Sequence, residues 1–217
     1  MAAMSVGSGP LVPSRLAPGG VAHGSRRAPT TILGAYIALT KPRIIELLLI
    51  TTVPTMILAE RGWPSTWLVV ATLIGGTLSA GSANAVNMYV DRDIDALMER
   101  TQARPLVTGV IEPRNALIFA LSLQVFAFGV LWAGANLLSA VLAFAAAGFY
   151  IGVYTIWLKR TSRQNIVIGG AAGAVPVLVG WSAVQNNVTW TPLVLFIVMF
   201  LWTPPHFWAL AVKYADD

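Results

Sequence analysis

Apolar residues gather in six long stretches that are separated by short polar segments. The stretches cover residues 44–60, 66–90, 115–133, 136–157, 165–184 and 190–212. Each approaches or exceeds the about 20 apolar residues with which a helix crosses roughly 30 Å of hydrocarbon. Short connections at 61–65, 134–136 and 185–189 join some of the stretches into antiparallel hairpins. The pattern therefore predicts an all-α fold, a polytopic transmembrane bundle with six spans.

Composition supports a membrane protein and limits the other classes. Hydrophobic residues make up 56% of the 217 residues and charged residues only 11%, against about 25% charged residues in a soluble domain. The chain has no cysteine, which excludes disulfides and thiolate metal ligands. Residues 1–35 are rich in Gly, Pro, Ala and Ser and contain no long apolar run. We therefore expect a disordered N-terminal tail, followed by one transmembrane domain over residues 36–217.

The basic residues lie almost entirely on one side of the predicted membrane. Of the 14 Lys and Arg residues, all except Arg61 precede span 1, follow span 6, or lie between spans 2 and 3 or spans 4 and 5. Short loops rich in Lys and Arg stay in the cytoplasm. We therefore expect a multi-pass protein of the cell (inner) membrane with a cytoplasmic N-terminus. The net charge of +5 then reflects this orientation, and we expect no nucleic-acid partner.

An acidic stretch at the end of span 2, NMYVDRDIDALMER (87–100), holds four of the nine acidic residues. Asn87, Asp91 and Asp95 are four residues apart, so on a helix they fall within about 80° of one another. Asp93 points elsewhere. Two carboxylates at this spacing repel each other, and a cation between them relieves the repulsion. Because Mg²⁺ binds through one or two carboxylates plus substrate phosphates, the stripe of Asn87, Asp91 and Asp95 predicts a magnesium site.

Three other interpretations of the acidic stretch differ in strength. A calcium-binding EF-hand loop needs Gly at its sixth position and Glu at its twelfth, where this chain has Ala96 and Gln102. The signature of phosphatidyl-alcohol transferases has Gly at the position of Asn87, and its upstream half is absent here. A loop of solvated acids at a helix end stays open from the residues alone.

Four segments carry a family resemblance, and their combination is specific. They are LTKPRI (39–44), ANAVNMYVDRDIDALMERTQARPL (83–106), YTIWLKRTSRQNIVIGGAAGAVP (154–176) and WTPPHFWALAVKYADD (202–217). Together they make the chain resemble the UbiA-type intramembrane prenyltransferases over about residues 39–217. The words RDIDALMERT and TPPHFWAL resemble the branch of that family that prenylates haem.

The resemblance implies a reaction, a cofactor and partners. A farnesyl group would pass from farnesyl diphosphate to a vinyl group of haem B (protoheme IX) with addition of water, giving haem O and pyrophosphate. The implied cofactor is Mg²⁺, with Asn87, Asp91 and Asp95 as catalytic and metal-binding residues. Beyond the two substrates and membrane lipid, the resemblance offers haem A synthase and oxidase assembly proteins as candidate partners.

Further site residues follow from the same resemblance. Diphosphate binding is expected of six basic residues on the cytoplasmic side: Lys41, Arg43, Arg100, Arg104, Lys159 and Arg160. Taken singly, each is better explained by lipid headgroups or by the positive-inside distribution, and only the set as a whole favours diphosphate binding. Tyr154 would present its ring to the farnesyl cation, although an aromatic residue near the interface also serves as an anchor. His206 would bind haem and, as an ionisable residue inside a span, is expected to face an interior or a cavity. Packing is a sufficient explanation for the small residues GGAAGA (169–174).

The resemblance also implies a longer protein. Family members have nine spans and a second acidic motif just after span 6, and Asp216 and Asp217 look like the start of that motif. We therefore expect Asp217 to join a second metal site, and we expect this segment to be inactive without the rest. Two alternatives stay open: a non-catalytic membrane protein that binds haem or a partner, and a prenyltransferase whose acceptor is a quinone-type aromatic ring.

Overall fold

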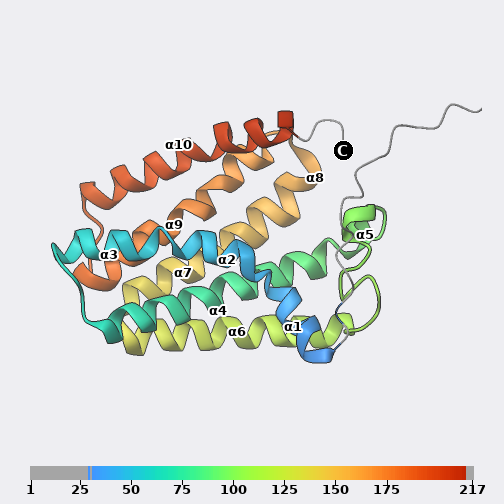
Figure 1. The fold of residues 1–217 in the computed structure, drawn as a ribbon, viewed down its shortest axis with the longest axis horizontal. Helices are drawn as coiled ribbons and strands as arrows, with labels where there is room; N and C mark the ends of the chain where they lie inside the picture. The colour runs from blue at the N-terminus through green and yellow to red at the C-terminus, as the bar shows by residue number, and fades with distance from the viewer. Residues whose placement is uncertain (1–28, 30, 214–217) are drawn as a thin grey trace, which may run out of the picture.

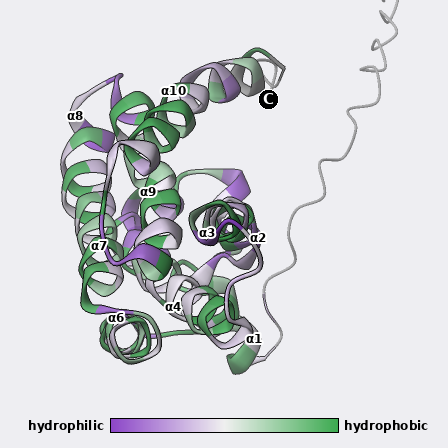
Figure 2. Cartoon of the chain, turned by 90° about the vertical axis from the view of Figure 1, so that its left-hand side faces the viewer, coloured by the Kyte–Doolittle hydropathy of each residue, from purple (hydrophilic) through white to green (hydrophobic). Residues whose placement is uncertain are grey.

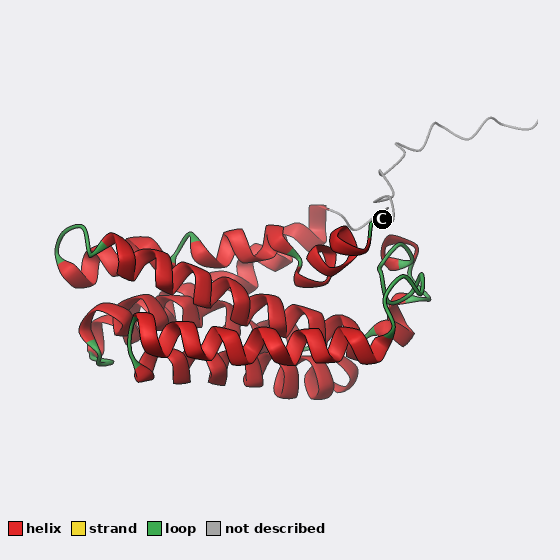
Figure 3. Ribbon diagram, turned by 90° about the horizontal axis from the view of Figure 1, so that it is seen from below, coloured by secondary structure: helices red, strands yellow, loops and turns green. Residues whose placement is uncertain are grey.

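The computed structural model describes residue 29 and residues 31–213, and this part of the chain consists of helices joined by loops (Figures 1 and 3). In chain order the elements are α1 (Ile32–Thr40), α2 (Pro42–Leu49), α3 (Thr52–Glu60), α4 (Thr66–Val90), α5 (Arg92–Asp95), the 3₁₀ turn η1 (Glu99–Thr101), α6 (Pro113–Gly134), α7 (Leu137–Phe149), the π-helix η2 (Tyr150–Leu158), α8 (Lys159–Thr161), α9 (Asn165–Gln185) and α10 (Trp190–Lys213). The predicted all-α fold is confirmed.

Six helical stretches are long and apolar enough to cross a membrane. They are Pro42–Glu60, Thr66–Val90, Pro113–Gly134, Leu137–Thr161, Asn165–Gln185 and Trp190–Ala209. The first joins α2 and α3, and the fourth joins α7, η2 and α8. Many large apolar side chains on these stretches are exposed, and much of the ribbon of the long helices has the colour of hydrophobic residues (Figure 2). On these faces a bilayer takes the place of water. The six predicted spans are therefore confirmed to within a few residues.

Two helices form the interior of the bundle. α4 packs most extensively against α6, and α9 packs against α10, α3 and α7. Small residues make these close approaches possible. A methyl group added at Gly75 of α4 would lie 2.4 Å from Leu131 Cγ of α6, and one at Gly170 of α9 would lie 2.8 Å from Thr203 Cγ2 of α10. The expected packing role of the small-residue run in α9 agrees with these contacts.

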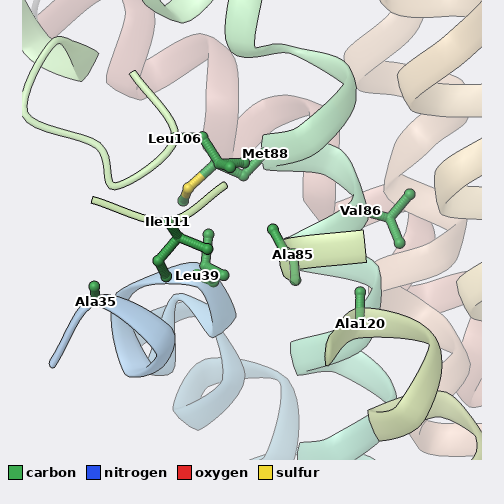
Figure 4. Packing of buried hydrophobic residues seen from close by; sticks show 9 residues of the cluster. Ala35, Leu39, Ala85, Val86, Met88, Leu106, Ile111 and Ala120 are labelled. Atoms are coloured by element: carbon green, nitrogen blue, oxygen red, sulfur yellow. The ribbon is translucent and has the colours of Figure 1, made fainter. Parts of the chain in front are cut away.

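One end of the bundle carries α1, α5, α8 and the C-terminal end of α10 (Figure 1, right). A buried cluster that includes Leu39, Ala85, Met88, Leu106 and Ile111 joins α1 and α4 to the loop that follows η1 (Figure 4). This cluster fixes the loop close to the end of α4. The acidic stretch lies at the same end.

The beginning of the helical part differs from the sequence prediction. α1 starts at Ile32 and is capped by Thr31, whose hydroxyl accepts a hydrogen bond from Gly34 N at 3.1 Å. The predicted tail extended to residue 35. The rest of that tail, residues 1–28 and residue 30, lies outside the described residues.

Candidate active site

The acidic stretch lies where α4 ends. Asp91 N donates to Asn87 O at 2.9 Å, and Asp95 N donates to Asp91 O at 2.8 Å, so the helical hydrogen-bond pattern continues into α5. The stripe of Asn87, Asp91 and Asp95 therefore shares one face, as its spacing predicts. Its side chains are 3%, 0% and 1% exposed, respectively. Burial this complete rules out a loop of solvated acids for these three residues.

Three basic side chains from separate segments contact the stripe. Lys41 Nζ donates to Asn87 Oδ1 at 2.6 Å. Lys159 forms an ion pair with Asp91 Oδ2, and Arg104 forms an ion pair with Asp95 Oδ2. Three cations facing two carboxylates leave one positive charge in excess among these groups. Such a site favours an additional anion.

A break between α1 and α2 brings Lys41 to the stripe. Lys41 adopts the left-handed conformation, with φ 55° and ψ 61°, and Pro42 opens α2. The proline ring disfavours a right-handed helical conformation at the residue before it, and the left-handed one costs roughly 1–2 kcal/mol. The pKa of Lys41 is lowered to about 8, chiefly by burial and also by the nearby Arg104 and Lys159 cations, while the Asp95 and Asp91 carboxylates oppose the shift.

The oxygens of the stripe suit a divalent cation. Within the described part of the chain, Asp91 Oδ1 and Asp95 Oδ1 are buried and have no hydrogen-bond partner. Each unpaired buried oxygen costs about 1–3 kcal/mol, and a bound cation removes that cost. Carboxylate and amide oxygens are ligands that Mg²⁺ takes. Among the described residues, no group of three or more His, Cys, Asp or Glu side chains is placed so that it could hold a metal ion by itself. This half-site would therefore need further ligands, such as substrate phosphates.

Thr155 belongs to the site but was not among the predicted residues. It is fully buried in η2. Its Oγ1 accepts a hydrogen bond from Asn87 Nδ2 at 3.2 Å and donates to Tyr150 O at 2.9 Å. One signal was present in the sequence: Thr155 precedes Lys159 by four residues, the same spacing as between Asn87 and Asp91.

Arg160 contacts an acidic residue outside the stripe. Its guanidinium donates to both oxygens of Asp93, at 2.8 and 3.0 Å, and to Val90 O at 3.1 Å. These bonds to Arg160 lower the pKa of Asp93, whose side chain is 58% exposed. The expectation that Asp93 points away from the stripe is confirmed, and the pair ties α8 to the end of α4.

Only part of the predicted basic set reaches the stripe. Lys41, Arg104 and Lys159 do, whereas Arg160 pairs with Asp93. Arg43 and Arg100 are exposed, and neither forms an ion pair with a stripe residue in the described part of the chain. The structure therefore brings three of the six basic residues to the stripe, and diphosphate binding by the set stays a prediction.

Tyr154, which was predicted to face the farnesyl cation, and His206, which was predicted to bind haem, lie in different surroundings. Tyr154 is half-buried and stacks on Tyr150 with ring centroids 5.1 Å apart. His206 is exposed on α10 and stacks on Trp202 with centroids 4.4 Å apart. The described elements therefore leave His206 exposed, and the expectation that it faces an interior or a cavity stays a prediction. Asp217 lies outside the described residues.

Comparisons with known proteins agree on one family. A family model described as the UbiA prenyltransferase family matches residues 48–217. A protoheme IX farnesyltransferase of Clavibacter sepedonicus is 60% identical over 84% of this chain and 60% of its own length. Protoheme IX farnesyltransferase 1 of Saccharopolyspora erythraea is 59% identical over 90% of this chain and 64% of its own length. The chain thus spans somewhat less than two thirds of these relatives.

One solved structure shares the fold. It is that of a UbiA homolog from Archaeoglobus fulgidus bound to DMAPP and Mg²⁺. Its TM-score is 0.61, and the match covers 78% of this chain and 60% of that chain at 20% sequence identity. The helical arrangement described above is therefore the arrangement of that fold.

Proposed function

The chain belongs to the UbiA prenyltransferase family, and we propose that the whole protein transfers a farnesyl group from farnesyl diphosphate to a vinyl group of haem B, giving haem O. The observation that carries the proposal is the buried stripe, where two carboxylate oxygens have no hydrogen-bond partner among the described residues and three cations leave an excess of positive charge. The similarity to protoheme IX farnesyltransferases supports haem as the acceptor.

The reaction requires positive groups close to the diphosphate, because the diphosphate gains one negative charge as it leaves. The bond between farnesyl C1 and the diphosphate oxygen breaks, and pyrophosphate keeps the electron pair. The haem vinyl group bonds to C1, and water adds to the resulting cation and releases a proton. When bound, Mg²⁺ supplies charge neutralisation for the leaving pyrophosphate, and Asn87, Asp91 and Asp95 are the residues that would hold it.

The chain's own cations bind the diphosphate. An ammonium group has three N–H donors and a guanidinium group five, so Lys159 and Arg104 can each keep a carboxylate and still donate to a phosphate oxygen. Lys41 adds a third cation beside Asn87. Donors that are already positioned before the reaction stabilise the charge that develops on the leaving group.

Four further assignments complete the proposal. Tyr154 presents its ring to the farnesyl cation, and its stacking on Tyr150 supports a fixed ring position. His206 binds haem, for which its exposure on α10 leaves it accessible. Asp217 contributes to a second metal site. The stripe lies on the cytoplasmic side of the inner membrane, as the distribution of Lys and Arg supports.

The product identifies the reaction. Membranes that contain the whole protein are incubated with farnesyl diphosphate, Mg²⁺ and either haem B or a quinone-type aromatic acceptor, and products are identified by mass. We expect haem O from the haem B incubation. A prenylated product from the aromatic acceptor alone would overturn haem as the substrate, and haem binding that depends on His206 without any product would indicate a non-catalytic protein.

A further inference from the structure

We propose that Thr155 is a positioning residue that holds the Asn87 amide with its oxygen facing the site. This inference rests on the proposed function, because it concerns how the chain presents a ligand to the divalent cation. It starts from η2, where nine consecutive residues, Tyr150–Leu158, form a π-helix. π-Helical segments are rare and are found frequently at functional sites.

The π-helix places two side chains against α4. The Thr155 hydroxyl donates to Tyr150 O, five residues earlier, and Lys159 N donates to Tyr154 O, also five residues earlier. With this geometry Thr155 contacts Asn87, and Lys159 contacts Asp91. Thr155 and Lys159, four residues apart, therefore contact Asn87 and Asp91, which are also four residues apart.

Hydrogen-bond chemistry fixes the direction of the Thr155 contact. The hydroxyl has one hydrogen, and it is donated to Tyr150 O. Toward Asn87 the hydroxyl can only accept, so it selects the NH₂ group of the amide. That NH₂ group donates at 3.2 Å to Thr155 and at 2.7 Å to Asp91 Oδ2. Asn87 Oδ1 is left facing Lys41 Nζ, which can only donate.

Thr155 differs in charge from the other two partners of the amide. Lys41 and Asp91 are charged. In the proposed function Lys41 also binds the diphosphate, and Asp91 also binds the cation. Thr155 is neutral and fully buried, so its contact does not compete with either ligand. It therefore holds the amide orientation independently of what the charged groups bind. Residues that orient metal ligands in this way typically account for about 10- to 100-fold in metal affinity or activity.

The test compares Thr155→Val, which keeps the shape and removes the hydroxyl, with Thr155→Ser, which keeps the hydroxyl. Thr72→Val is a matched control, since Thr72 is also fully buried and donates to a backbone carbonyl, Leu68 O, at 2.7 Å. Mn²⁺ binding to the purified whole protein is measured by electron paramagnetic resonance, alongside the Mg²⁺ concentration that half-activates prenyl transfer. Thermal unfolding shows that each variant is folded, and Thr155→Ala replaces Thr155→Val if that variant is not.

We expect Thr155→Val to weaken Mn²⁺ binding about 10- to 100-fold, with Thr155→Ser and Thr72→Val close to the wild type. Wild-type affinity in Thr155→Val, or an equal loss in Thr155→Ser, would overturn the inference. Mn²⁺ binding that depends on the Thr155 hydroxyl, together with no haem O, would leave the inference standing and refute the proposed function. Absence of Mn²⁺ binding to the wild type would overturn both.

Discussion

Replacing Lys159 by Met tests whether the ion pair at the stripe compensates a buried charge. The Asp91 side chain is 0% exposed, and its only partners in the described part of the chain are Lys159 and the Asn87 amide, which donates at 2.7 Å. Lys159→Met keeps an unbranched side chain, one atom shorter, and removes its charge. The Asp91 carboxylate is then left buried with one neutral donor.

The expected cost follows from that burial. Removing one partner of a buried ion pair destabilises a protein by about 3–5 kcal/mol. Because the Lys159 side chain is 28% exposed, we expect the lower end, about 3 kcal/mol. Each kcal/mol lowers Tm by roughly 2–4 °C in a protein of 150–250 residues, and the effect falls with length, so for the longer whole protein we expect a fall in Tm of about 6 °C. Asp91→Asn removes the carboxylate charge that Lys159→Met leaves without a partner. The double variant Lys159→Met/Asp91→Asn should therefore recover most of the lost free energy of unfolding.

Thermal unfolding of the whole protein in detergent micelles without Mg²⁺ measures this effect. Arg163→Met is the matched control, because Arg163 is exposed between the same two spans and forms no ion pair among the described residues. We expect a change within about 0.5 kcal/mol for the control. A Lys159→Met variant as stable as the control, or additive losses in the double variant, would refute the reasoning.

Two further variants test the surroundings of the stripe. A methyl group in Gly169→Ala would lie 2.3 Å from Tyr154 Cδ2, so we expect a displaced ring, a loss of about 1–3 kcal/mol and slower prenyl transfer. Gly148→Ala, with nothing within 4 Å of the added methyl, should change neither unfolding nor rate, and an equal effect of both variants would contradict the steric argument. Asp93→Asn breaks the exposed pair with Arg160, and exposed ion pairs are screened by water, so we expect thermal unfolding close to that of the wild type and product formation within a few-fold of it. A complete loss of product would instead place Asp93 in the site.

The spans and the stripe could be predicted because each depends on local patterns. A helix that crosses hydrocarbon must be long and apolar, so the boundaries of the spans follow from hydropathy alone. Asn87, Asp91 and Asp95 share a face because of their four-residue spacing. Neither inference requires knowledge of which helices are neighbours.

The residues that surround the stripe depend on tertiary structure and were predicted less well. Lys41 and Arg43 both precede span 1, yet only Lys41 contacts Asn87, because the break before Pro42 turns it inward. Thr155 was missed because an isolated Thr in an apolar span most often bonds its own backbone. The exposure of His206 depends on which elements pack against α10. The residues of α10 alone do not show which elements these are.

Prenyl transfer by the Asp91→Asn variant tests the central claim most directly. Membranes that contain the whole protein or this variant are supplied with haem B, farnesyl diphosphate and Mg²⁺, and haem O is quantified by mass while membrane insertion is verified. If Asp91 holds the cation that neutralises the leaving group, haem O formation should fall by roughly 100-fold or more with insertion unchanged. Wild-type amounts of haem O from the inserted variant would contradict the assignment of the stripe.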